Sequence, residues 1–249
     1  MLERRYIPET ENRLVILHAL EKLGPITEMQ LLRFLTELDL MNYFDMKLNL
    51  CDMLDRGKLA EEPHPLGALL CITAEGRQLL TDFEKRIPAS RREMIDQSTT
   101  VWRAAFRREQ QTLADVFPLS DGSSCIRLRL LENRSAILDA MITVQEAKPQ
   151  HQIQQKWLQC SGDLYSAITD SLAQGFLGEM PQEDLPPNTA VQQMENTDWL
   201  LSMADEPAHP RMTLMMALPD EAMARHYALR WPAQCQAIGK VICEALEES

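Results

Sequence analysis

Apolar residues recur at intervals of three to four positions through the first part of the chain, which is the spacing of amphipathic helices. This pattern predicts a first helix over residues 12–23. A second helix is expected to start at Thr27, because Gln30 stands three positions further on, as in a capping box. A third is expected to run from Asn42, a residue type that caps helix N-termini, to Arg56, which precedes a glycine.

The pattern then changes to short strands. Residues 58–62 and the more apolar residues 68–73 are expected to form a hairpin around a turn at 63–67, where prolines and a glycine cluster. A further helix is expected after Thr73. The order helix, helix, helix, hairpin, helix is that of a winged helix, in which the second and third helices form the helix-turn-helix and residues 59–72 the wing.

Short motifs at the junctions of these elements resemble those of known bacterial families. The segment Ile72-Thr73-Ala74-Glu75-Gly76-Arg77 resembles the strand-to-helix junction of MarR- and PadR-type regulators. A closer resemblance, to the bacterial domain-of-unknown-function family 4364, continues to about Leu172. It is carried by Asn42-Tyr43-Phe44, Leu54-x-x-Gly57-x-Leu59, Ile72-Thr73-x-Glu75-Gly76, Arg86-Ile87-Pro88 and Arg107-x-Glu109-x-x-x-x-Ala114-Asp115. The resemblance implies a winged helix and suggests a transcription regulator, and it supplies no catalytic residues.

The third helix would be the DNA-reading helix of such a fold. Helical geometry, at about 100° per residue, separates its two sides. The side expected to pack inward comprises Phe44, Leu48, Cys51 and Leu54. The side expected to face a major groove comprises Asp45, Asn49, Asp52 and Arg56.

Candidate DNA contacts come from this outward side and its surroundings. Asparagine suits adenine, and arginine suits guanine or phosphate. The candidates are Lys47, Asn49, Arg56, Arg33 and His64. The arginine-rich segment 85–108 is expected to supply further phosphate contacts. Against these stand two aspartates on the same helix side and a wing tip without lysine or arginine.

Residues 90–113 are predicted to form one long helix with an aromatic stripe. A long helix after the winged helix often carries the dimer contact in MarR- and PadR-like proteins. The resemblance therefore suggests that Trp102 and Phe106 contact a second subunit. The alternative is that both side chains pack on the C-terminal domain of the same chain.

Apolar positions alternate after Gly122, which indicates strands. Two groups of strand, strand and helix are expected, at 125–131, 137–144 and 149–173 and again at 199–203, 212–218 and 219–246. In an ungapped alignment of the two groups, Ile142 meets Met216 and Trp157 meets Trp231. We therefore expect a duplication, with repeats over 123–173 and 197–247 joined by a linker at 175–188.

The expected fold class is α+β, with an N-terminal winged helix-turn-helix, a long connecting helix and a C-terminal duplicated strand-strand-helix domain. The corresponding ranges are 1–88, 89–118 and 119–249. The two repeats would form one four-stranded antiparallel sheet with two helices on one face, since each repeat alone leaves an apolar sheet face uncovered. Such a domain could serve dimerisation or hold a small effector.

The charge distribution narrows the possible partners. The formal net charge of −12 argues against binding nucleic acid or an anionic membrane through overall charge. Residues 151–249 carry −9 of it, and the segment 85–134 is locally basic. The excess therefore belongs mostly to a domain that need not approach DNA.

The sequence also bears on compartment and chemistry. Neither a secretory signal nor an apolar run long enough to span a membrane is found, and the cysteines lack C-x-x-C spacing, so a cytoplasmic protein with reduced thiols is expected. Nucleotide-binding loops, nucleophile elbows and zinc-binding motifs are not found. We therefore expect no enzymatic activity, no cofactor and no metal site.

Two hypotheses for function follow from these patterns. The first is a dimeric winged-helix regulator that binds double-stranded DNA and carries a C-terminal dimerisation or sensor domain. The second is a winged-helix module that binds a protein partner and no DNA, using the acidic side of the third helix.

Overall fold

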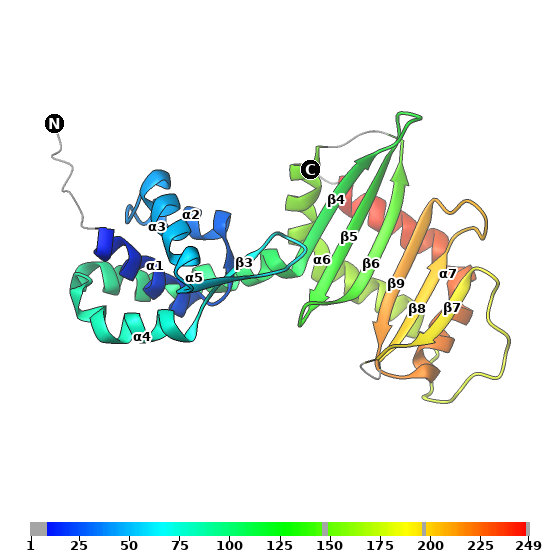
Figure 1. Cartoon of the computed structure of the whole chain (residues 1–249). Coiled ribbons are helices and arrows are strands. Elements are labelled where there is room, and N and C mark those ends of the chain that lie inside the picture. The colour runs from blue at the N-terminus through cyan, green and yellow to red at the C-terminus, as the bar shows by residue number, and fades with distance from the viewer. Residues whose placement is uncertain (1–8, 146–148, 196–197, 248–249) are drawn as a thin grey trace. The chain divides into compact units, whose positions relative to one another are not determined.

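The computed structural model describes residues 9–145, 149–195 and 198–247. The chain forms two compact units that divide between Arg108 and Glu109, and each unit is described by itself. The elements of both units are labelled in Figure 1.

The first unit consists of helices around a small sheet. Its elements are α1 (Glu9–Leu23), β1 (Ile26–Thr27), α2 (Glu28–Glu37), α3 (Tyr43–Asp55), β2 (Leu59–Glu62), β3 (Leu69–Ile72), α4 (Ala74–Phe83), the short 3-10 helix η1 (Glu84–Arg86) and most of α5 (Ala89–Gln111). The strands pair antiparallel in the order β1-β3-β2. The expected order of helices and hairpin strands is present, and β1 is an addition that no sequence pattern indicated.

Side-chain caps determine where these helices begin. The Thr27 hydroxyl accepts a hydrogen bond from the Gln30 amide at 3.2 Å, and the Gln30 side-chain carbonyl accepts one from the Thr27 amide at 3.1 Å, so the predicted capping box is confirmed. Asn42 caps α3 by accepting from the Asp45 amide at 3.0 Å, and Thr73 caps α4 in the same way. Each cap satisfies an amide that the first helical turn leaves unpaired.

Helix α5 completes the core of the first unit. It contributes Ile95 and Phe106 as buried side chains to the cluster formed by α1, α2, α3 and the hairpin. The Gln30 side chain donates a hydrogen bond to the Phe106 carbonyl at 3.3 Å, which joins α2 to α5 through a buried polar contact. The residues 89–108 of α5 thus belong with the N-terminal helices.

A buried histidine joins α1 to the segment that follows α4. His18 Nδ1 lies 3.2 Å from Glu84 Oε1, and His18 Nε2 lies 3.2 Å from Asp96 Oδ1. Lys22 Nζ approaches the same Asp96 oxygen at 3.1 Å. Burial raises the pKa of the Asp96 carboxyl, but hydrogen bonding and charge from Lys22 and His18 outweigh it, so this pKa lies below its ordinary value.

The second unit is a six-stranded antiparallel sheet with two long helices. Its elements are β4 (Thr112–Pro118), β5 (Ser124–Glu132), β6 (Ser135–Val144), α6 (Gln150–Ala173), β7 (Thr189–Gln193), β8 (Trp199–Ala204), β9 (Met212–Leu218) and α7 (Glu221–Glu247). The strand order is β4-β5-β6-β9-β8-β7. The expectation of four strands is therefore wrong, because each half contributes three strands before its helix.

The two strands missing from the expectation are the edge strands β4 and β7. Leu113 continues the helical spacing of Trp102 and Phe106, which extended the predicted long helix into β4. In the structure the helix ends at Gln111, and Thr112 pairs with Leu130 of β5 instead. Strand β7 is short and follows the predicted linker directly, so only its pairing with β8 identifies it.

Helices α6 and α7 both cover the same face of this sheet, as predicted (Figure 1). They enclose a core built from the buried residues of β4, β5, β6, β8 and β9, against which Val191 of β7 packs. Trp157 of α6 and Trp231 of α7 are its largest fully buried side chains. The opposite sheet face, called here the open face, carries the alternate residues of each strand.

Candidate functional site

Helix α3 turns a different side to the core than its sequence pattern indicated. The buried side comprises Met46, Asn49, Leu50 and Met53. Phe44 and Leu48, which were expected to pack inward, are 75% and 73% exposed, and Cys51 is exposed as well. The predicted assignment of the two helix sides is therefore wrong.

Asn49 is held inside the first unit and is 5% exposed. Its side-chain nitrogen donates to the Asp45 carbonyl at 2.7 Å, and its side-chain oxygen accepts from Arg13 Nε at 3.2 Å. The oxygen thus joins α3 to α1, and the nitrogen bonds to a carbonyl one turn earlier in α3 itself. Asn49 is thus a structural residue and does not present its amide to a base.

The outward side of α3 is apolar. The Tyr43 ring meets that of Phe44 edge-on at 5.5 Å between centroids, and Leu48 lies one helical turn after Phe44. From the start of α2, Met29 is 69% exposed. We call Met29, Tyr43, Phe44 and Leu48 the α3 face. Clustered exposed apolar side chains of this size mark interaction sites more often than single ones do.

Lys47 is paired with a carboxylate beside this face. Its Nζ lies 2.7 Å from both carboxylate oxygens of Glu28. The hydrogen bond to Glu28 raises the pKa of Lys47, so the lysine stays charged and its charge is compensated locally.

Arg56 is likewise paired at the end of α3. Its Nε donates to Asp52 Oδ1 at 2.7 Å, one helical turn away. Arg13 of α1 approaches the other oxygen of the same carboxylate at 3.2 Å. Asp52, expected to repel DNA phosphates, thus organises two arginines, and Arg56 keeps a mostly exposed side chain.

Arg33, Trp102 and Phe106 form one cluster within the first unit. The Arg33 guanidinium lies 5.6 Å from the Trp102 ring centroid and 5.1 Å from that of Phe106. Trp102 also meets Phe34 of α2 edge-on at 5.8 Å. Phe106 is 1% exposed and belongs to the core cluster of the first unit, with Trp102 packed against that cluster, so the Phe106 ring is not presented to a second subunit.

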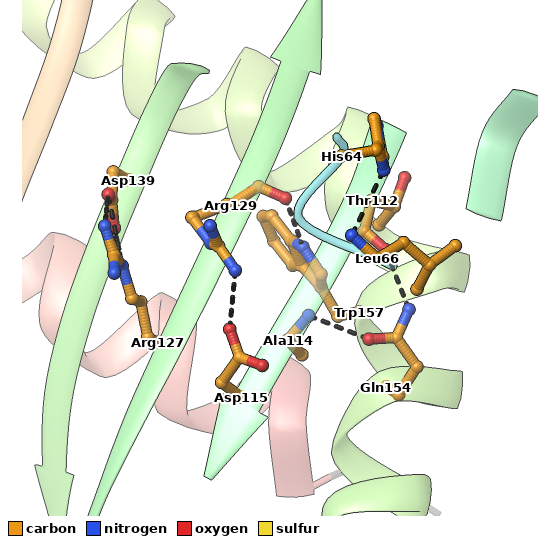
Figure 2. Close-up of polar contacts among 10 residues, drawn as sticks. All are labelled: His64, Leu66, Thr112, Ala114, Asp115, Arg127, Arg129, Asp139, Gln154 and Trp157. Atoms are coloured by element: carbon orange, nitrogen blue, oxygen red, sulfur yellow. Dashed lines mark hydrogen bonds and ion pairs between the residues drawn. The ribbon is translucent and has the colours of Figure 1, made fainter. Parts of the chain in front are cut away.

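His64 stabilises the turn of the hairpin. Its Nδ1 accepts a hydrogen bond from the Leu66 amide at 3.1 Å, drawn in Figure 2. Gly67, whose φ of +122° favours glycine, closes the turn by donating to the His64 carbonyl at 2.9 Å. Between β2 and β3 the sequence has no lysine or arginine, so this tip offers no fixed positive charge.

Part of the charge in the arginine-rich segment 85–108 is engaged within the first unit. Arg91 pairs with Glu11 at 3.2 Å, and Arg86 stacks on Phe83 at 4.6 Å. Arg103 and Arg107 are exposed. Phosphate contacts from this segment would therefore have to come mainly from the second half of α5.

The open face of the second unit carries an ionic ladder that the sequence reading missed. Arg129 donates to Asp115 across β4 and β5 at 2.7 Å, and Arg127 forms a bidentate pair with Asp139 of β6, with its shortest contact at 2.5 Å (Figure 2). In the sequence, Arg127 and Arg129 alternate with apolar residues, which indicates that both face outward. Their acidic partners could be found only with β4 recognised as a strand and with the register known.

The described residues contain no group of three or more histidine, cysteine, aspartate or glutamate side chains that could hold a metal ion. All cysteines are free thiols, and burial raises the pKa of Cys125 and of Cys160. In the same described ranges, no helix has both the length and the apolar character needed to cross a bilayer.

These features define the class of the protein: an α+β chain with an N-terminal helical unit, a six-stranded antiparallel C-terminal sheet and an exposed apolar face on α3. The chain belongs to the family named Domain of unknown function (DUF4364), whose sequence model matches residues 12–172. The match runs from α1 to the end of α6. Neither a curated protein nor a solved structure matches this chain.

Proposed function

We propose that the first unit is a winged-helix module, related to MarR- and PadR-type regulators, that binds a protein partner through the α3 face. The order of its helices and hairpin supports the winged-helix assignment. The observation that carries the proposed function is the apolar outward side of α3, where Phe44 and Leu48 are 75% and 73% exposed. A helix that reads DNA would present polar and cationic side chains there.

The charges around the α3 face also favour a protein partner over DNA. Lys47 and Arg56, which would have contacted DNA, are each compensated by a carboxylate within hydrogen-bond distance. Asp45 and Asp55, near the two ends of α3, are exposed. The partner that fits is a protein surface with an apolar centre flanked by lysine or arginine.

This function requires no catalysis. The module acts by presenting a surface. The acidic excess of the C-terminal half does not hinder it, because the partner proposed for α3 carries basic groups.

A photo-crosslinking amino acid placed at Leu48 tests the α3 face directly in cells. We expect a discrete adduct between this chain and one partner protein. The matched control is the same crosslinker at Gln97, an exposed position of α5, which should give no such adduct. The same adducts from both positions, or none from Leu48, would contradict the proposal.

The crosslinker is next moved to the neighbouring position Tyr43, where we expect it to give the same adduct. The substitutions Phe44→Ser and Leu48→Ser should then abolish this adduct. Because both side chains are mostly exposed, we expect the free energy of unfolding to change by no more than about 0.5 kcal/mol. A urea unfolding curve measures this change. Loss of the adduct with unchanged stability indicates a binding surface, whereas a strongly destabilised variant would indicate a packing role.

Titration of random duplex DNA at low salt separates the two functions. We expect no binding under conditions in which a regulator contacting several phosphates binds readily. Binding that weakens with salt by about 0.9 log units per phosphate would overturn the proposal. In that case, Arg103→Ala with Arg107→Ala would identify α5 as the source of the phosphate contacts.

A further inference from the structure

The second unit repeats one path of the chain. Strands β4, β5 and β6 followed by α6 form the first repeat, and β7, β8 and β9 followed by α7 form the second. The sheet order β4-β5-β6-β9-β8-β7 reads the same from both edges, with the last strand of each repeat at the centre (Figure 1). Strands β6 and β9 therefore form the seam between the repeats.

The register at this seam shows a two-fold relation. One offset along the chain relates Leu138 to Met212, Ala140 to Leu214 and Ile142 to Met216. In the sheet, Leu138 pairs with Met216 and Ile142 pairs with Met212, so equivalent residues exchange places. Ala140 pairs with its own equivalent, Leu214. This reciprocity is the pattern of an interface between two identical subunits around a two-fold axis.

Contacts away from the seam follow the same relation. Trp157 of α6 donates its indole N–H to the Arg129 carbonyl of β5 at 3.0 Å (Figure 2). Trp231 of α7 donates in the same way to the Ala204 carbonyl of β8 at 2.7 Å. The two acceptors hold equivalent positions, since Arg129 lies opposite Asp139 and Ala204 lies opposite Thr213, the residue that the seam offset assigns to Asp139.

The family match ends inside this two-fold arrangement. It reaches residue 172, at the end of α6, and thus includes the first repeat and leaves out the second. Without the second repeat, β6 would be an open edge, and the buried residues Leu138, Ala140 and Ile142 would lose their neighbours on β9. Such an edge requires a covering strand.

The two repeats differ in the residues that they place on the open face of the sheet. Strand pairing makes Ala190, Ser202, Ala204 and Thr213 the equivalents of the ladder residues Asp115, Arg127, Arg129 and Asp139. The buried seam keeps its apolar character in both repeats, whereas, among the residues that the structure describes, ion pairs lie on the open face of the first repeat and not of the second. The second repeat has therefore retained the surface that covers β6.

We propose that the second repeat takes the place of a second copy of the first repeat, so that this chain is a single-chain equivalent of a dimer. The surface concerned is the β6 edge with the adjoining side of α6, and the partner that fits it is a first repeat or its internal equivalent. This inference does not rest on the function proposed for α3. It implies that each particle carries one N-terminal unit and engages one partner, whatever that partner is.

Sedimentation equilibrium of the full chain over a wide concentration range is the first test. We expect a single species with the mass of one chain, 28.5 kDa. A stable particle of twice this mass would overturn the inference, because the pairing of β6 with β9 would then not have replaced the contact with a second chain.

A matched pair of proline variants tests the surface itself. Leu214→Pro disrupts β9, because proline removes a ladder amide and clashes within a central strand, and it should free β6 to pair with β6 of another chain. We expect this variant to dimerise. Gln192→Pro, in the edge strand β7, leaves the pairing of β6 with β9 in place and should not dimerise. Equal masses for two folded variants would contradict the inference.

A nicked full-length chain provides a test that does not depend on the folding of these variants. A protease site inserted between Gly178 and Asp184, in the exposed segment between the repeats, allows cleavage after folding. The two fragments should stay together in buffer. When mild urea releases the smaller one, the larger one should double in mass. A larger fragment that keeps its own single mass after release would overturn the inference.

Discussion

Trp157→Ala and Trp231→Ala will each destabilise the C-terminal unit by about 3–5 kcal/mol, the range measured for truncating large buried side chains. Both indoles are fully buried, at the point where their helix meets the middle strand of the same repeat. Each truncation also leaves a backbone carbonyl without its indole donor, which adds to the loss. Because the two sites are equivalent, we expect the two effects to agree within about 1 kcal/mol.

Hydrogen exchange of the β5 and β8 amides measures this free energy for the C-terminal unit alone. The control is tryptophan to phenylalanine at each position, which keeps most of the apolar contact and removes the N–H donor. It should cost about 1–3 kcal/mol. A loss below about 1 kcal/mol for either alanine variant would show that the indole does not support its repeat.

Gly76→Ala will destabilise the first unit by about 1–3 kcal/mol, although alanine is the better helix former. A Cβ built on Gly76 would lie 2.2 Å from the Lys58 carbonyl oxygen, which is backbone and cannot rotate away. The same carbonyl accepts hydrogen bonds from the Thr73 amide at 3.2 Å and the Thr73 hydroxyl at 3.0 Å. Relief of the clash therefore requires α4 to move away from the start of β2.

The matched control for this variant is Gly162→Ala in α6. A Cβ on Gly162 would meet no atom within 4 Å, so alanine should stabilise α6 by about 0.5–1 kcal/mol through its helix propensity. Hydrogen exchange of the β3 amides and of the α6 amides reports the two units separately. If Gly76→Ala leaves the free energy of unfolding unchanged, the junction between β2 and α4 adjusts freely to the added Cβ.

Local patterns were sufficient wherever a few neighbouring residues decide the structure. The capping box at Thr27 and Gln30 and the N-cap Asn42 lie where the sequence predicted them, because a cap depends on residues within one helical turn. The alternation of apolar residues likewise indicated β5, β6 and β9. These predictions concern contacts that are close in the sequence.

The candidate site was predicted less well, because α3 has two apolar sides. Phe44, Leu48 and Cys51 form one stripe at helical spacing, and Met46, Leu50 and Met53 form another. Both satisfy the same periodicity, so the pattern could not say which faces the core. The structure buries the second stripe, with Asn49 bonded to Arg13 of α1, and leaves the first in solvent.

The sequence by itself determined the helices, the main strands, the α+β class and the repeated Trp157 and Trp231, because these follow from short-range spacing and composition. Only the tertiary structure decided which side of α3 is exposed, that β4 and β7 complete the sheet, and that Ala140 faces Leu214 across a two-fold seam. Such features depend on pairing between segments distant in the chain. Their free energy comes from burial and strand register that no local pattern encodes.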